Sequence, residues 1–179
     1  LGNYTNIVNC VIEDSSSPQN GGAIYVEGHN ATISAEFVNT NATVSGGSIY
    51  VRGLHATIVN SSFDNTHAFG SRDNGGGAIF ISGDYADIES SNFTYNYANN
   101  NHEARGGAIY ITGLNTTISD SNFEHSRSNL YGGAIYINGT NTTVKASNFT
   151  DCTVNSDGSQ GGAIYIDGDF TSVEESNLR

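Results

Sequence analysis

Carboxylates, histidines and lysines are the side chains of this sequence that could support catalysis or bind a metal, and they are scattered along the chain. The 179 residues include 18 acidic residues, five histidines and six lysines and arginines. Enzymes that cleave polysaccharides need paired carboxylates, often with Ca²⁺ or a basic side chain beside them. Asp167 and Asp169 form an isolated pair, and the single lysine, Lys145, stands apart from it. We therefore expect no enzymatic activity and no cofactor.

Nine asparagines begin the N-x-[S/T] pattern, which is the acceptor of N-linked glycans. Asn30, Asn115 and Asn141 share one turn position of the repeat described below, and Asn92 and Asn148 share an outward position before a phenylalanine. We expect all nine to be accessible and several to carry glycans, which requires an extracellular route. The nine are Asn3, Asn30, Asn41, Asn60, Asn92, Asn115, Asn138, Asn141 and Asn148.

The elements that position these residues come from an internal repeat, for which GGAIYI at 106–111 is the landmark. A glycine pair, then Ala or Ser, an aliphatic, an aromatic and a second aliphatic residue occur six times, at intervals of 25 to 30 residues. Another aliphatic residue lies nine positions after the first, and a Phe or Leu follows it four or five positions later. The pairs begin at Gly21, Gly46, Gly76, Gly106, Gly132 and Gly161.

Each repeat reads as three short segments rich in β-branched residues, separated by Gly, Asn and Ser, with no helical stripe. Repeats of this kind are typical of solenoids, in which each coil packs only on its neighbours. Stacked strands lie about 4.8 Å apart, so equivalent side chains form ladders. We therefore predict an all-β fold in which residues 1–179 form one parallel β-helix of about six coils, with three short strands per coil.

Side-chain alternation assigns each position of the repeat to the core or the surface. The residue after the second aliphatic is polar in every repeat, so both aliphatics should point inward, and the alanine and the aromatic residue outward. The later aliphatic, the phenylalanine and the serine two positions before it should also point inward. This places six rings in an outward stripe, namely Tyr25, Tyr50, Phe80, Tyr110, Tyr136 and Tyr165.

The stripe has three interpretations at this stage. Tyrosine favours strands, and stacked rings support one another between coils. Alternatively, a flat and partly apolar stripe could contact another protein, or stack on sugar rings.

Histidine and cysteine, which are common zinc ligands, occur here without zinc-site spacing. Cys10 falls in the inward serine position, so we expect a small buried residue there. A disulfide between Cys10 and Cys152 would have to cross about five coils, roughly 24 Å, which exceeds disulfide reach. The histidines share no position of the repeat, so no metal site is predicted; they are His29, His55, His67, His102 and His125.

The repeats resemble those of the chlamydial polymorphic outer membrane proteins and of adhesin-like surface proteins of methanogenic archaea. The GGAI motif and its variants occur six times, FxN stands at 37–39 and 63–65, and FxxN at 93–96. The repeats at Phe123, Phe149 and Leu178 lack that asparagine. The resemblance covers essentially the whole chain. It implies a right-handed β-helix on a cell surface, with a role in adhesion or envelope structure.

Variable stretches follow each phenylalanine, and we expect them to emerge at one corner of the coil. Loops on one face of a solenoid often bind partners, although length variation alone would also explain them. Neither end carries a capping helix, and open strand edges recruit other chains. The sequence therefore suggests either a segment of a longer array or a subunit that stacks end to end, with self-association through the coil ends or the stripe.

Composition narrows the possible partners. The net charge of −12 leaves no basic stripe for nucleic acid. No apolar run approaches the roughly 20 residues that span a bilayer, so membrane insertion is not expected. We expect an extracellular structural or adhesive protein at the cell surface, with a host-cell or polysaccharide ligand as a possible partner. The alternative is a β-helix that binds or degrades polysaccharide.

Overall fold

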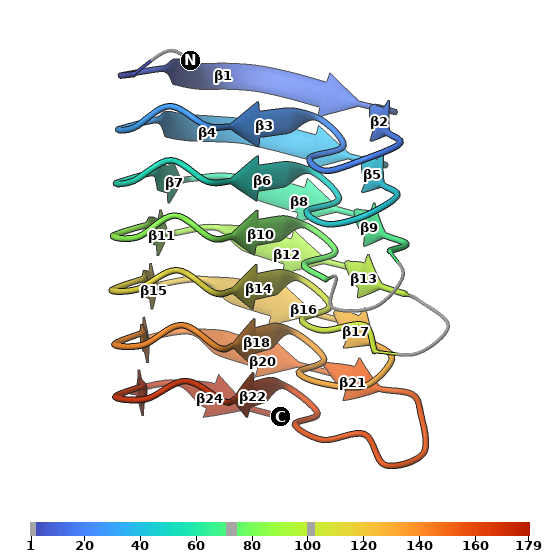
Figure 1. Cartoon of the computed structure of the whole chain (residues 1–179). Coiled ribbons are helices and arrows are strands. Elements are labelled where there is room, and N and C mark those ends of the chain that lie inside the picture. The colour runs from blue at the N-terminus through green and yellow to red at the C-terminus, as the bar shows by residue number, and fades with distance from the viewer. Residues whose placement is uncertain (1–2, 71–74, 100–102) are drawn as a thin grey trace.

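Stacked parallel coils make up the whole molecule in this computed structural model (Figure 1), which describes residues 3–70, 75–99 and 103–179. Every strand pair is parallel, and the described residues contain no helix. The two ends of the chain lie at opposite ends of the stack (Figure 1). The predicted β-solenoid of about six coils is confirmed.

The GGAIYI segments form one six-stranded sheet with every repeat in register. Each strand covers the aliphatic, the aromatic and the second aliphatic residue. Its members are β3 (Ile24–Val26), β6 (Ile49–Val51), β10 (Ile79–Ile81), β14 (Ile109–Ile111), β18 (Ile135–Ile137) and β22 (Ile164–Ile166).

The other two predicted segments form two arms of one larger sheet, joined by the long strand β4 (Thr32–Val38), and the long strand β1 (Asn6–Glu13) pairs with β4. The first arm contains β7 (Thr57–Val59), β11 (Asp87–Glu89), β15 (Thr117–Ser119), β19 (Thr143–Lys145) and β23 (Ser172–Glu174). The second contains β8 (Ser62–Asp64), β12 (Asn92–Thr94), β16 (Asn122–Glu124), β20 (Asn148–Thr150) and β24 (Asn177–Leu178).

A third sheet lies within the stretches that the sequence presented as variable. Each of its strands has two residues and begins four positions after the inward Ile or Phe that precedes it. Its members are β2 (Ser16–Ser17), β5 (Asn41–Ala42), β9 (His67–Ala68), β13 (Tyr97–Ala98), β17 (Arg127–Ser128) and β21 (Thr153–Val154).

A left-handed corner separates the two arms in most coils, and in β1 it remains at Asn9 (φ 55°) as a shift in the register with β4. The spacing between the later aliphatic residue, such as Ile58, and the phenylalanine decides whether this corner occurs. Where five residues separate them, the second residue after the aliphatic has a positive φ, as at Asn60 (48°) and Ser90 (50°). Where only four separate Ile33 from Phe37, no such residue occurs and β4 runs straight through. The extra residue of the longer spacing is therefore the one that forms the left-handed corner.

The glycine pair serves two separate purposes at another corner. Gly106 has φ +61°, a conformation that L-residues rarely adopt. Gly107 packs on the next coil, where a Cβ would overlap the carbonyl oxygen of Gly133. Neither position tolerates a side chain, and this explains why the pair is repeated in every coil.

Ladders of identical side chains fill the core. The rings of Phe37, Phe63, Phe93, Phe123 and Phe149 are fully buried, and each is stacked on the next with centroids 4.7 to 4.8 Å apart. The inward positions predicted for the aliphatics are confirmed throughout the inner coils. In the last coil, Val173 and Leu178 lie in the expected ladders but are exposed at the end of the stack.

The inward serines replace backbone hydrogen bonds at the left-handed corner between the arms. The backbone N–H of Ser91 donates to Oγ of Ser121 at 3.2 Å, and that of Ser121 donates to Oγ of Ser147 at 3.2 Å. Cys10 pairs with Ala35 in this register, as predicted, but the prediction that it is buried is wrong. Cys10 is exposed because it lies in the first coil of the stack, with a neighbouring coil on one side only.

The alanine of GGAIYI points into the core, which corrects the predicted outward position. Ala78, Ala108 and Ala134 are fully buried and pack in the main core cluster. The alternation rule fails here because the strand begins at the following isoleucine, and the alanine belongs to the turn. The backbone N–H groups of Ala78 and Ile79 both donate to the carbonyl of Ala108, at 2.9 Å each, which fits a turn rather than a pleated strand.

Candidate binding surfaces

The aromatic residues of the first sheet point away from the main core and form a column of their own, the aromatic column. Successive rings pair in register with centroids 4.8 to 5.3 Å apart. Phe80, Tyr110 and Tyr136 are only 9%, 5% and 4% exposed. The rings thus lie outside the main core, as predicted, but those in the middle of the column are covered; Tyr25 is exposed, and Tyr50 and Tyr165 are half-buried.

Arg105 and Tyr131, which sequence reasoning missed, cover part of the aromatic column. The guanidinium carbon of Arg105 lies 5.4 Å from the Tyr136 ring centroid and 6.0 Å from that of Tyr131. The Tyr131 ring lies 4.7 Å from that of Tyr165. Both residues directly precede a glycine pair and are linked by isolated parallel bridges between coils, so that position was the signal in the sequence.

Ring geometry varies along the column. Tyr25 and Tyr50 are stacked with 5° between the ring planes, as are Tyr136 and Tyr165, whereas Tyr110 and Tyr136 meet edge to face at 89°. Burial raises the pKa of Tyr136 to about 12, although Arg105 acts to lower it. The Tyr136 hydroxyl donates to Asp167 at 3.3 Å.

The nine sequon asparagines all lie at exposed or half-buried positions, as predicted. Several belong to amide ladders that run along the stack. Nδ2 of Asn122 donates to Oδ1 of Asn92 at 3.0 Å, and Nδ2 of Asn148 donates to Oδ1 of Asn122 at 2.9 Å. Nδ2 of Asn141 donates to Oδ1 of Asn115 at 2.6 Å. A glycan on Nδ2 leaves one N–H, so attachment and the ladder are chemically compatible.

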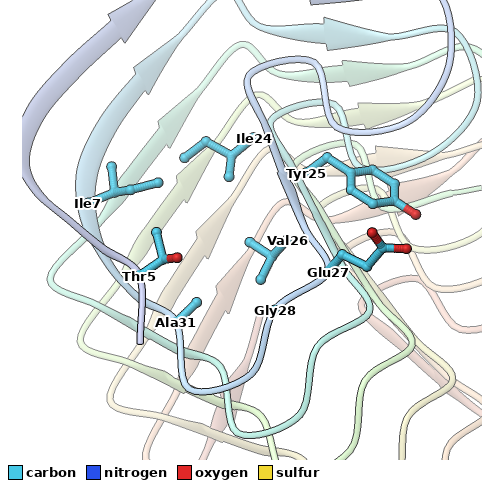
Figure 2. A pocket seen from close by; sticks show the side chains of 8 residues that line it. All are labelled: Thr5, Ile7, Ile24, Tyr25, Val26, Glu27, Gly28 and Ala31. Carbon is cyan, nitrogen blue, oxygen red and sulfur yellow. The ribbon is translucent and has the colours of Figure 1, made fainter. Parts of the chain in front are cut away.

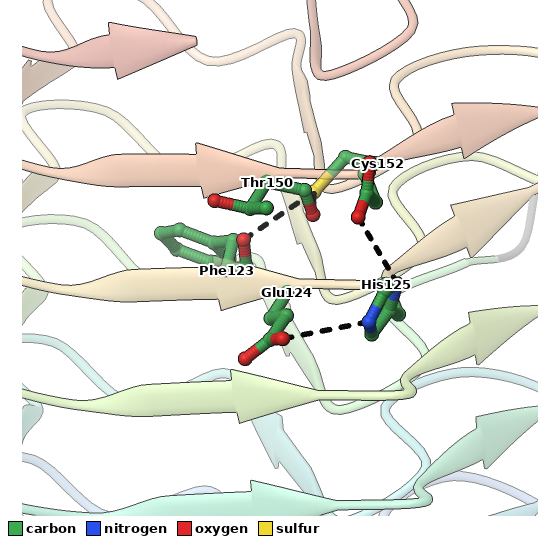
Figure 3. Close-up of polar contacts among 6 residues, drawn as sticks. Phe123, Glu124, His125, Thr150 and Cys152 are labelled. Atoms are coloured by element: carbon green, nitrogen blue, oxygen red, sulfur yellow. Dashed lines mark hydrogen bonds and ion pairs between the residues drawn. The ribbon is translucent and has the colours of Figure 1, made fainter. Parts of the chain in front are cut away.

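Histidine, cysteine and carboxylate side chains are the residues that could bind a metal ion. No group of three His, Cys, Asp or Glu side chains in the described part of the chain is arranged to hold a metal ion. His102 lies outside the described residues. The histidine with the most carboxylate neighbours is His125, 3.4 Å from Glu124 and 3.8 Å from Asp151 (Figure 3).

Cys152 lies beside this histidine but inside the coil. Its thiol is directed at the carbonyl oxygens of Thr150 and Phe123, at 3.5 and 3.6 Å (Figure 3). Burial raises the pKa of the thiol to about 11. Both cysteines are free thiols, in agreement with the prediction that they do not form a disulfide.

A hollow of about 240 Å³ opens at the first-coil end of the stack (Figure 2). The side chains of Ile7, Ile24 and Val26 point into it, while the Tyr25 ring points away (Figure 2). Strand β3 has a neighbour on one side only. The hollow is therefore the end of the repeated core.

A groove on the third sheet is the second feature that sequence reasoning missed. Residues two and four positions after each inward Ile or Phe of the second arm point outward, and the residue between them points inward. Two rows of outward side chains therefore run along the stack with a furrow between them. In three successive coils these rows line a groove of about 280 Å³, with Asn96 at its floor. One row holds Asn65, Tyr95 and His125, and the other holds His67, Tyr97 and Arg127.

Ring contacts and hydrogen bonds fix the walls of the groove. Tyr95 stacks on His125 with centroids 4.9 Å apart, and the Tyr97 hydroxyl donates to Oδ1 of Asn129 at 2.9 Å. Nε2 of His67 lies 3.0 Å from Oδ1 of Asn65, which closes one end. Burial lowers the pKa of His67, which favours its neutral form. The sequence signal was present in the FxN motif, because extending that register along the variable stretch aligns both rows.

Among the described residues, no helix could span a membrane. No family model, curated protein or solved structure matches the chain.

Proposed function

We propose that this protein is an extracellular structural and adhesive β-helix, displayed at a cell surface and N-glycosylated. Its stack holds side chains in fixed rows along a rod, which suits a scaffold that presents repeated contacts. Resemblance of the GGAI repeats to those of surface adhesins supports the same proposal.

The observation that carries the proposal is the placement of the sequons. All nine lie outside the core, although the coil buries a large share of its residues. Asn30, Asn115 and Asn141 occupy the same turn of the coil, and each has a positive φ of 56° to 58°. Glycans at such positions would project from one edge of the rod without disturbing the core.

Polysaccharide binding is the second candidate, and the groove of the third sheet favours it. Aromatic walls with hydrogen-bonding groups beside them are what a sugar-binding surface needs. We assign no reaction to the chain.

Self-association through the coil ends forms part of the same proposal. A parallel edge strand such as β3 presents unpaired backbone groups, and identical repeats provide a matching strand. Sedimentation velocity over a range of concentrations tests this: we expect a concentration-dependent shift to larger species, and an unchanging monomer would contradict end-to-end stacking.

Antibodies against the folded chain, applied to intact and to permeabilised cells of the source organism, test surface display. We expect intact cells to bind the antibody as well as permeabilised cells do. Staining that requires permeabilisation would contradict an extracellular role.

A further inference from the structure

The groove of the third sheet is not required by the fold. Its two rows continue through the other coils as Asp14 and Ser16, Asn39 and Asn41, and Asp151 and Thr153. Those coils keep the same backbone, including a positive φ at the first position of each pair. Large ring and cationic side chains occur only in the three coils that line the groove, among the described residues, so their presence needs a reason other than stability.

The charge of the groove differs from that of the chain. None of its seven lining residues is acidic, although the chain has 18 acidic residues and a net charge of −12. Arg127 is exposed and forms no ion pair within the described part of the chain. The carboxylates of Glu124 and Asp151 lie near His125 but do not line the groove, which leaves Arg127 as its free cationic end.

Arginine offers a planar fork of donors that matches a carboxylate. The rings of Tyr95 and Tyr97 form opposite walls, and aromatic rings pack well against the C–H faces of sugars. At the closed end, His67 and Asn65 supply polar groups for hydroxyls. The groove extends over two coil steps, about 10 Å, which limits it to a short stretch of a chain-like ligand.

We propose that this groove binds carboxylate-bearing sugar residues of a uronate-containing polysaccharide, with Arg127 holding the carboxylate and Tyr95 and Tyr97 flanking the sugar. The proposal deepens the adhesive function proposed above by naming a site and a ligand class. It rests on that function for the biological source of the ligand, although the binding itself is measured independently.

The test is a nuclear magnetic resonance titration of the full chain with hexagalacturonate, with its methyl ester as the uncharged counterpart. We expect hexagalacturonate to shift resonances of residues 65–67, 95–97 and 125–127, and the ester to bind at least about tenfold more weakly. A hexamer of glutamate serves as the non-sugar polyanion and should also bind more weakly.

Variants taken from other coils keep the fold intact while removing the groove. Arg127→Thr introduces the residue found at position 153, and Tyr95→Asn the residue found at position 65. Each should weaken hexagalacturonate binding about tenfold. Lys145→Gln removes the same charge from a strand of the larger sheet, away from the groove, and should leave binding within about twofold.

Several outcomes overturn the proposal. They are the absence of binding, shifts that map elsewhere, an ester or glutamate hexamer that binds equally well, or an Arg127→Thr variant that binds like the unmodified chain. A protein found inside cells would contradict the proposed surface display without changing this titration, so the two failures are distinguishable.

Discussion

The guanidinium carbon of Arg105 lies 5.4 Å above the ring of Tyr136, so a residue that precedes one glycine pair covers an aromatic residue of the following coil. Arg105 also pairs with Glu103 at 3.1 Å, and its side chain is only 14% exposed. This contact covers the Tyr136 ring, which forms a second buried cluster with Phe80 and Tyr110 outside the main core.

Replacing Arg105 with alanine should therefore destabilise the fold. Cation–π contacts contribute about 0.5 to 2 kcal/mol, and the loss also exposes the column. We expect the free energy of unfolding in urea to fall by about 1 to 2 kcal/mol. Arg52→Ala is the control, because its ion pair with Glu27 is exposed and 3.7 Å long, and it should leave the urea midpoint nearly unchanged. Equal effects of the two substitutions would contradict the covering role of Arg105.

The second glycine of each pair should be intolerant of substitution wherever another coil lies against it. A Cβ at Gly107 would overlap the backbone of Gly133, whereas the nearest atom to one at Gly162 is 3.6 Å away. We expect Gly107→Ala to reduce the free energy of unfolding by roughly 3 kcal/mol or more, and Gly162→Ala to change it by less than about 1 kcal/mol. Thermal and urea unfolding of the two variants measure this difference directly. Similar losses at both positions would show that backbone freedom, rather than close packing, explains the pair.

Cys10 and Cys152 should differ in reactivity. Cys10 is exposed, whereas burial raises the pKa of Cys152 to about 11, and only the thiolate reacts readily. At pH 8, iodoacetamide should modify Cys10 in the folded chain and Cys152 only in denaturant, as peptide mass spectrometry would show. Equal labelling of both thiols in the native chain would contradict the burial of Cys152.

The same pKa shift predicts a pH dependence of stability. A thiol with a raised folded pKa contributes stability that is complete below its ordinary value near 9 and is lost as the pH rises toward about 11. The Cys152→Ser variant carries the residue found at Ser126, the same position of the neighbouring coil, and lacks this ionisation. Its urea midpoint should therefore approach or exceed that of the unmodified chain as the pH rises from 8 to 11. A constant difference across that range would contradict the shift.

The sequence was sufficient to predict the features that repeat with the coil. Ile33 and Phe63 were placed correctly because a period that recurs in every coil fixes both the stacking and the inward face. Ala108 was misplaced because pleat alternation was extended into a turn. The position of Cys10 in its ladder is predicted correctly, but its burial is not, because its coil has a neighbouring coil on only one side.

The candidate surfaces were harder to predict because they depend on residues that vary between coils. Arg105 and Tyr131 share a position with asparagine, serine, glycine and glutamine in other repeats, so no ladder of identical residues marks them. Tyr95 and Arg127 lie in stretches of changing length, in which only the fixed offset from the preceding phenylalanine marks the short third sheet. A repeat pattern thus predicts the scaffold, whereas specific surfaces arise where the pattern is broken.

The central claim is that this rod is an N-glycosylated protein of the cell exterior, and glycopeptide mass spectrometry of the protein isolated from its own cells tests it most directly. We expect glycans on several of the exposed sequons, with Asn138 and Asn148 as the clearest candidates. Asn122, which lies in the same amide ladder as Asn148 but begins no sequon, is the internal control and should carry no glycan. Peptides that carry no glycan at any of the nine sequons would contradict the claim.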